Sequence, residues 1–178
     1  NLYGIEYRKN LFIDTIHKFC INNILLPFSD LYSNKCDIQK CKIVKNLTKY
    51  YNEFFDHFSI TDKSTKDSYK KFFKEYKYKQ YKNQEKAKQS YEYYSNIFYN
   101  NNCLNFDLVL DIANEIIKDD YVCKCIEAKY PYILIDEYQD SSIAMHTLFK
   151  TLIDKTNIIF YIVGDPDQAI YGFTASSP

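Results

Sequence analysis

The chain has 178 residues, of which 46% are hydrophobic, so it is long enough for one core, or for one core with a smaller satellite domain. Its 23 Lys and Arg residues balance 23 Asp and Glu residues, so the whole-chain charge gives no argument for a nucleic-acid partner, and such binding would depend on local patches. No apolar run approaches the roughly 20 residues that a membrane-spanning helix needs, and no charged-then-apolar leader opens the chain. We therefore expect a cytoplasmic protein without a membrane partner.

Six cysteines raise the alternatives of disulfides or a metal site. They form no repeated C-x-x-C pair, and the histidines do not have zinc-site spacing. Ordinary reduced thiols of an intracellular protein are the favoured interpretation. The cysteines are Cys20, Cys36, Cys41, Cys103, Cys123 and Cys125.

Near the start of the chain, the apolar run Leu11–Ile13 predicts a short strand. Asp14 and Thr15 follow it, and both residue types cap helix N-termini. The helix that they begin has its apolar residues at steps of three and four, which places them on one side: Ile16, Phe19, Cys20 and Ile24.

The next strong pattern runs from Ile43 to Phe58, where apolar residues recur at three- and four-residue steps and predict an amphipathic helix. Residues 61–102 are rich in lysine, tyrosine and glutamine, and two aromatic stripes predict two further helices with a break near Tyr78–Lys82. This stretch is either a solvated lysine face over a tyrosine-rich core, which we favour, or a stacking platform for single strands. The stripes are Tyr69, Phe72, Phe73 and Tyr76, and then Tyr91, Tyr94 and Phe98.

The last third of the chain alternates helical and strand patterns. A helical stripe spans Phe106–Ile117, and a connection over Cys123–Lys129 leads to Tyr132–Ile135, whose unbroken apolar character predicts a strand buried on both faces. A second buried strand is expected at Ile158–Val163, and the helix between the strands has cap candidates at Asp140–Ser142 and apolar residues Met145, Leu148, Phe149 and Leu152. Such a β-α-β unit should have a right-handed crossover, so both strands end on the same edge of the sheet.

Polar residues follow both of these strands. Asp136 and Glu137 come directly after the first strand, and Gly164–Gln168 follows the second. Ligands of open α/β sheets bind at the carboxyl ends of strands. An acidic pair placed there is costly unless a cation or hydrogen-bond donors offset its desolvation, which a magnesium nucleotide would do. An Asp-Glu pair also often caps a following helix, and the second strand end is what favours the nucleotide.

In P-loop hydrolases, an Asp at this place holds the magnesium ion, often through water. A neighbouring carboxylate there accepts a proton from the attacking water or orients it. Asp136 fits the first role and Glu137 fits the second.

These two strand ends resemble the UvrD/Rep family of superfamily-one DNA helicases. The second motif of that family is similar to Ile135–Ser141 and its third motif to Val163–Phe173, at the family's usual separation. Upstream, Asp14–Cys20 looks like the family's Thr-x-His-x-Phe element, which lies along the bound strand. Phe106 and Asp107, with their following helix, resemble the segment before the second motif.

The resemblance implies a motor that uses ATP and Mg²⁺. It implies that Gln168 senses the terminal phosphate, that Tyr171 and Phe173 lie near base-stacking positions, and that Thr15 and His17 contact DNA. The alternative for Tyr171 and Phe173 is that they are core aromatics. The alternative for Thr15 is a helix cap, and for His17 a satisfied histidine. The implied partners are single-stranded or partly duplex DNA and a second motor domain of the same parent, in the setting of DNA repair.

Three features depart from the family pattern. The only glycines are Gly4, Gly164 and Gly172, and no Gly-Lys pair is present, so we expect the phosphate-binding loop to precede Asn1 in a longer parent or to be absent. We therefore expect no appreciable ATP hydrolysis by this chain alone. The only arginine, Arg8, is poorly placed to offset transition-state charge, a role we assign to the missing second motor domain.

The third departure follows Phe173, where the family usually has Arg-Gly-Ala or a near relative. This sequence has Thr174–Ser176 instead, which weakens the inferred grip on DNA.

The expected fold is α/β, a partial P-loop NTPase (RecA-like) parallel sheet with a mostly helical inserted subdomain. Residues 1–24 and 103–178 would belong to the first motor domain (1A), and residues 25–102 resemble, by position, its helical insertion (1B). The expected function is that of a fragment of an ATP-dependent DNA helicase or translocase, in which hydrolysis drives movement on single-stranded DNA and duplex unwinding. A degenerate, non-catalytic binding module and the motor part of a helicase-nuclease are the alternatives. We expect nucleoid association if the source is prokaryotic.

Overall fold

The computed structural model describes residues 12–32, 36–81 and 83–165. Its first helix, α1 (Ile16–Cys20), begins where the Thr15 side chain accepts the Lys18 N–H, and it continues as a π-helical turn over Ile21–Leu25. The predicted helix and its cap are therefore confirmed. Leu11 of the predicted strand lies outside the described residues. Phe12 and Ile13 precede the helix and form no strand.

A short parallel ladder comes before the next long helix. Strand β1 (Lys42–Ile43) pairs with β2 (Cys103–Leu104), and the Val44 N–H donates to the Leu104 carbonyl at 2.9 Å. This pairing draws the chain into an extended form where we predicted the start of a helix. Helix α2 therefore spans Thr48–His57 rather than beginning at Ile43, and the Asn46 side chain accepts its first N–H, from Thr48, at 3.0 Å.

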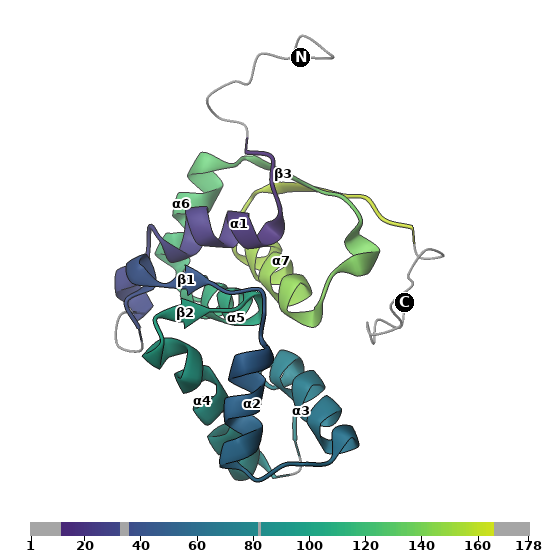
Figure 1. Cartoon of the computed structure of the whole chain (residues 1–178). Coiled ribbons are helices and arrows are strands. Elements are labelled where there is room, and N and C mark those ends of the chain that lie inside the picture. The colour runs from purple at the N-terminus through teal and green to yellow at the C-terminus, as the bar shows by residue number, and fades with distance from the viewer. Residues whose placement is uncertain (1–11, 33–35, 82, 166–178) are drawn as a thin grey trace, which may run out of the picture.

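Helices α2, α3 (Lys63–Glu75) and α4 (Gln84–Asn100) gather at one end of the molecule (Figure 1). We call them the α2–α4 bundle. The side chains of Asp62 and Asn83 cap α3 and α4, so the chain breaks between these helices where we predicted. Aromatic rings of the bundle stack on one another in its interior, with ring centroids 3.8 Å apart for Phe73 and Tyr94. The structure therefore shows the tyrosine-rich core that we favoured.

The other end of the molecule holds α1, α5 (Phe106–Ile116), α6 (Asp120–Lys129) and α7 (Ile143–Lys155) (Figure 1). Helix α5 is the predicted one, and the Ser142 side chain caps α7 by accepting an N–H from its first turn. Helix α6 replaces what we predicted as a plain connection. Asp119 caps this helix, because its carboxylate accepts the Tyr121 N–H at 2.8 Å, and the helix buries Val122, Cys123 and Ile126 against the core.

Strands β3 (Tyr132–Ile135) and β4 (Ile159–Ile162) pair in parallel on either side of α7 in the sequence, as predicted. Their predicted burial on both faces is wrong. Ile133 and Phe160 pack against the core, but the other face of the sheet is open. The reason is that the described residues supply only two strands and cover only one face, which leaves large apolar side chains exposed: Tyr132, Leu134, Ile159, Tyr161, Ile162 and Val163.

A buried polar network joins the α2–α4 bundle to α5 and α7. The carboxylate of Asp111, 4% exposed, accepts the hydroxyls of Tyr78 (2.7 Å) and Tyr91. The Asn114 amide donates to the Tyr78 hydroxyl at 3.2 Å and to the Ala144 carbonyl of α7 at 3.0 Å. The segment between α3 and α4 is thus hydrogen-bonded, through α5, to the first turn of α7.

Burial raises the pKa of the Asp111 carboxyl, although the charge of Lys77 and the two tyrosine hydroxyls act in the opposite direction. A folded pKa above the unfolded value means that this group's stabilising contribution is complete below the unfolded pKa and is lost as the pH rises through the folded pKa. We therefore predict that the stability of Asp111→Asn rises relative to that of the wild type when the pH is raised from about 4 to about 7. Urea unfolding of both proteins at both pH values measures this; a difference that is constant or of opposite sign would contradict the raised pKa.

Candidate active site

The carboxyl ends of β3 and β4 lie side by side. The strands are in register from Tyr132↔Ile159 to Ile135↔Ile162, and the pairing continues beyond them, because the Val163 N–H donates to the Ile135 carbonyl at 2.8 Å. The parallel arrangement thus brings the residues after β3 next to those after β4. This is the geometry that the two motifs predicted.

A tight turn follows β3. The Asp136 carboxylate accepts the Glu137 N–H at 2.9 Å, and Glu137 itself has a left-handed backbone with φ 53°. A short 3₁₀ helix, Tyr138–Asp140, comes next, and the Tyr138 N–H donates across to the Val163 carbonyl at 3.0 Å. A residue other than glycine in this conformation costs on the order of 1–3 kcal/mol, and such strain is concentrated at functional sites.

Gly164 lets the turn after β3 approach the end of β4. A Cβ at this position would lie 2.7 Å from the side-chain oxygen of Gln139, and 3.2 Å and 3.3 Å from the backbone nitrogens of Gln139 and Tyr138. Two of these neighbours are backbone atoms, which cannot rotate away. A glycine is therefore favoured here by close approach rather than by a positive φ.

Asp136 and Glu137 are both exposed. Our expectation that burial would make this acidic pair costly is therefore wrong for the described structure, because water reaches both carboxylates. The open sheet face explains the difference, since nothing in the described part of the chain covers the strand ends. The oxygens of the pair are accessible to a hydrated cation.

Sequence reasoning missed two side chains that organise this turn. The amide of Gln139 donates to the Glu137 carboxylate and accepts the Asp165 N–H at 3.1 Å, so it touches the residues after both strands. The Tyr138 hydroxyl lies 2.6 Å from Nδ1 of His146 on α7. Their positions within the second motif and the following helix were visible in the sequence, but the partners depend on how the turn folds back across β4.

The other predicted site residues divide into two groups. Gln168, Tyr171 and Phe173 lie outside the described residues. Thr15 caps α1, and half-buried His17 packs against Phe106 with ring centroids 4.5 Å apart, while burial lowers its pKa. The Thr15 contact matches the helix cap, His17 has a ring contact with Phe106, and DNA contact by Thr15 and His17 stays a prediction.

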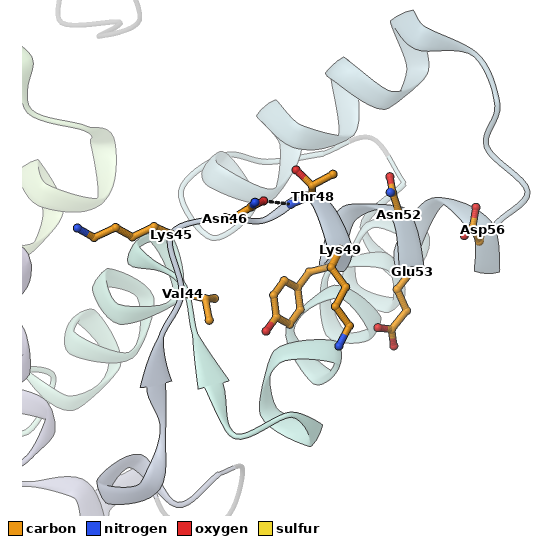
Figure 2. Close-up of a pocket in the computed structure, with 9 residues that line it drawn as sticks. Val44, Lys45, Asn46, Thr48, Lys49, Asn52, Glu53 and Asp56 are labelled. Carbon is orange, nitrogen blue, oxygen red and sulfur yellow. Dashed lines mark hydrogen bonds between the residues drawn. The ribbon is translucent and has the colours of Figure 1, made fainter.

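A wide hollow of about 1010 Å³ lies elsewhere, along α2 and the residues before it (Figure 2). Both signs of charge line it, as the side chains of Lys45, Lys49, Glu53 and Asp56 show (Figure 2). None of its lining residues comes from the ends of β3 or β4. The candidate site is therefore defined by the strand ends and not by this hollow.

Among residues 12–32, 36–81 and 83–165, no group of three or more His, Cys, Asp or Glu side chains is arranged to bind a metal ion. The six cysteines are free thiols. No helix in these ranges is long and apolar enough to cross a membrane.

Comparison with known proteins gives several similar relatives. The chain is 37% identical over 89 residues to the ATP-dependent DNA helicase Rep of Buchnera aphidicola subsp. Acyrthosiphon pisum, which covers 49% of this chain and 14% of that protein. It is 44% identical over 88 residues to the Gabija protein GajB of Bacillus cereus, 48% of this chain and 17% of that protein. Over 67 residues it is 37% identical to the RecBCD enzyme subunit RecB of Buchnera aphidicola subsp. Schizaphis graminum, 38% of this chain and 6% of that protein.

The aligned region thus spans less than a fifth of each of these relatives. A family model covers far more of the chain: the one described as the UvrD/REP helicase N-terminal domain matches residues 4–178. That match includes both strand ends and everything between them and the N-terminal helix. The chain therefore belongs to the UvrD/REP helicase N-terminal domain family.

Proposed function

We propose that this chain is part of the first motor domain of an ATP-dependent DNA helicase or translocase. The observation that carries the proposal is the juxtaposition of Asp136–Glu137 with Gly164–Asp165 at the ends of two adjacent parallel strands. Strand ends of this kind are where α/β proteins bind nucleotides. Family membership and relatives named as DNA helicases support the same function, with a P-loop NTPase (RecA-like) fold for the whole domain.

Asp136 is proposed to hold Mg²⁺. One of its oxygens accepts the Glu137 N–H, and its exposed carboxylate is a hard oxygen ligand of the kind that magnesium prefers. Magnesium in such sites is bound through one or two carboxylates, with water and substrate phosphates completing the shell, so a cluster of three protein ligands is not needed. The ion would neutralise charge on the β- and γ-phosphates of ATP.

Glu137 is proposed to orient the attacking water and accept its proton. Its left-handed backbone turns the chain at the end of β3, and its carboxylate accepts a hydrogen bond from Gln139, which in turn accepts the Asp165 N–H after β4. The loop after β4 leads to Gln168, which we propose senses the terminal phosphate. Both strand ends would then serve the same reacting group.

Residues 25–102, which contain the α2–α4 bundle, are proposed to be the 1B-like insertion between two parts of domain 1A. The β1–β2 ladder ties the two ends of the bundle segment together, as an insertion requires. Charge is also unevenly divided: residues 25–102 carry 15 lysines and nine acidic residues, and the remaining residues carry eight basic and 14 acidic ones. Residues 25–102 therefore have the local positive charge that attraction of DNA phosphates needs, which the balanced whole-chain charge conceals.

The chain by itself is predicted to bind a magnesium nucleotide more weakly than micromolar, because its sequence contains no Gly-Lys pair to form a phosphate cradle. A titration with a fluorescent ATP analogue and Mg²⁺ measures this directly. The matched control is the Asp136→Asn variant, which should behave like the wild type if the carboxylate alone gives no measurable binding. Micromolar binding by the wild type would show that the cradle is replaced by other residues.

The function itself is tested in the complete parent protein. ATP hydrolysis is measured with and without single-stranded DNA, and we expect strong stimulation by DNA. An intact parent that binds DNA but hydrolyses no ATP would favour the non-catalytic binding module instead. Magnesium-dependent DNA cleavage in addition to hydrolysis would identify the motor as part of a helicase-nuclease.

A further inference from the structure

The side-chain amide of Gln139 lies between the two strand ends. Its Nε2 donates to the Glu137 carboxylate, and its Oε1 accepts the Asp165 N–H at 3.1 Å. The close approach depends on Gly164, where a Cβ would lie 2.7 Å from that Oε1 atom. One side chain therefore connects the turn after β3 to the loop after β4.

The chemistry of the two partners fixes which way the amide points. A backbone N–H only donates hydrogen bonds, and an ionised carboxylate only accepts them. With the amide reversed, its oxygen would face the carboxylate of Glu137 and its NH₂ group would face the N–H of Asp165, so neither hydrogen bond would form. The amide oxygen must face Asp165, and the NH₂ group must face Glu137.

We infer that Gln139 is a positioning residue for ATP hydrolysis, which holds the Glu137 carboxylate at a fixed place relative to the loop after β4. The inference rests on the role proposed for Glu137. An exposed glutamate otherwise samples several rotamers, and a displacement of about 1 Å from the productive geometry can cost roughly 100-fold in rate. The backbone of Glu137 is fixed by its contact with Asp136, and Gln139 fixes the end of its side chain.

The two hydrogen bonds of the Gln139 amide, which we call the Gln139 bridge, also link two functions of the site. The loop whose N–H binds the Gln139 oxygen is the one that continues to Gln168, the proposed phosphate sensor. A shift of that loop would pull on the amide and move the Glu137 carboxylate with it. Gln139 would thus make the position of the water-orienting carboxylate depend on the state of the third motif, which contains the loop after β4.

The kinetic test removes the hydrogen bond from Gln139 to Glu137 in the complete parent. Gln139→Glu keeps the chain length and an oxygen that accepts the Asp165 N–H, but it sets a carboxylate oxygen against Glu137 in place of the donor. We expect kcat for DNA-stimulated ATP hydrolysis to fall about 10- to 100-fold, as for other residues that orient catalytic ligands, with little change in KM for ATP. The matched control is Gln89→Glu on α4, where an amide also donates to a carboxylate, that of Glu85, at 3.0 Å; its kcat at saturating single-stranded DNA should be unchanged.

A second measurement needs no turnover. In the 178-residue chain, hydrogen exchange of the Asp165 amide is followed by nuclear magnetic resonance. Gln139→Leu removes the acceptor, so this amide should exchange faster than in the wild type. Gln139→Glu retains an acceptor, so its Asp165 amide should exchange at close to the wild-type rate.

The outcomes separate this inference from the proposed function. An active parent whose kcat is unchanged by Gln139→Glu would overturn the inference alone, and so would a loss expressed mainly in KM, which would mean nucleotide binding rather than positioning. Unchanged Asp165 exchange in Gln139→Leu would show that the bridge does not form. A wild-type parent without ATP turnover would refute the proposed function, and with it the role of Gln139 in hydrolysis. The exchange measurement would still decide whether the bridge exists.

Discussion

Glu137→Gln in the complete parent is expected to lower DNA-stimulated ATP turnover by roughly 100- to 10,000-fold while ATP binding is retained, because a positioned general base contributes about that factor. The substitution keeps the size of the side chain and its ability to accept a hydrogen bond from Gln139. It removes the negative charge and the basicity that proton acceptance requires. The measurements are steady-state hydrolysis with saturating single-stranded DNA and equilibrium binding of a fluorescent ATP analogue.

The matched control for this prediction is Glu92→Gln, the same chemical change at an exposed position of α4. Its turnover should equal that of the wild type. Near-normal turnover in Glu137→Gln would remove Glu137 from the mechanism. A loss of ATP binding as large as the loss of turnover would instead assign the carboxylate to holding the magnesium nucleotide.

Phe54→Ala is expected to reduce the free energy of unfolding by about 3–5 kcal/mol, the usual loss for a fully buried phenylalanine. The Phe54 ring is 0% exposed and lies at the centre of the α2–α4 bundle. Its ring centroid is 4.8 Å from that of Phe73 on α3 and 6.5 Å from that of Tyr94 on α4, so truncation leaves a cavity that all three helices border. Urea denaturation followed by circular dichroism measures the change.

Phe58 supplies the internal comparison for that prediction. It is the same residue type at the end of α2 and contacts Phe54 at a centroid distance of 4.7 Å, but it is 40% exposed. Phe58→Ala should therefore cost clearly less, because part of its surface is already in water and truncation opens no closed cavity. Equal losses for the two variants would show that the bundle is not centred on Phe54.

Much of the fold followed from local sequence patterns. Helices α3, α4, α5 and α7 and both strands of the β3–β4 pair were predicted because each carries its own cap or apolar periodicity. Helix α6 was missed because it is short and its buried side, Val122, Cys123 and Ile126, covers little more than one turn, while its start depends on the Asp119 cap. The start of α2 was misplaced because pairing with β2, which lies far along the chain at Cys103–Leu104, overrides the helical pattern at Ile43.

The candidate site was predicted in its composition but not in its connections. Asp136, Glu137 and Gly164 were placed correctly at the strand ends, because parallel pairing can be inferred from two apolar runs joined by a helix. The Gln139 bridge and the left-handed backbone of Glu137 were not, since both depend on a turn that crosses to the neighbouring strand. Burial of the strands was overestimated because periodicity indicates which residues are apolar and not how many layers cover them.

The open face of the β3–β4 sheet has a practical consequence for anyone who handles this chain. Tyr161 and Leu134 are 54% and 73% exposed, and within the described residues each strand has a neighbour on one side only. Free backbone donors and acceptors beside a hydrophobic surface are a template for edge-to-edge pairing between molecules. Concentrated preparations of the isolated chain should therefore self-associate through the β3–β4 sheet. Charged residues introduced on its exposed face should reduce this association.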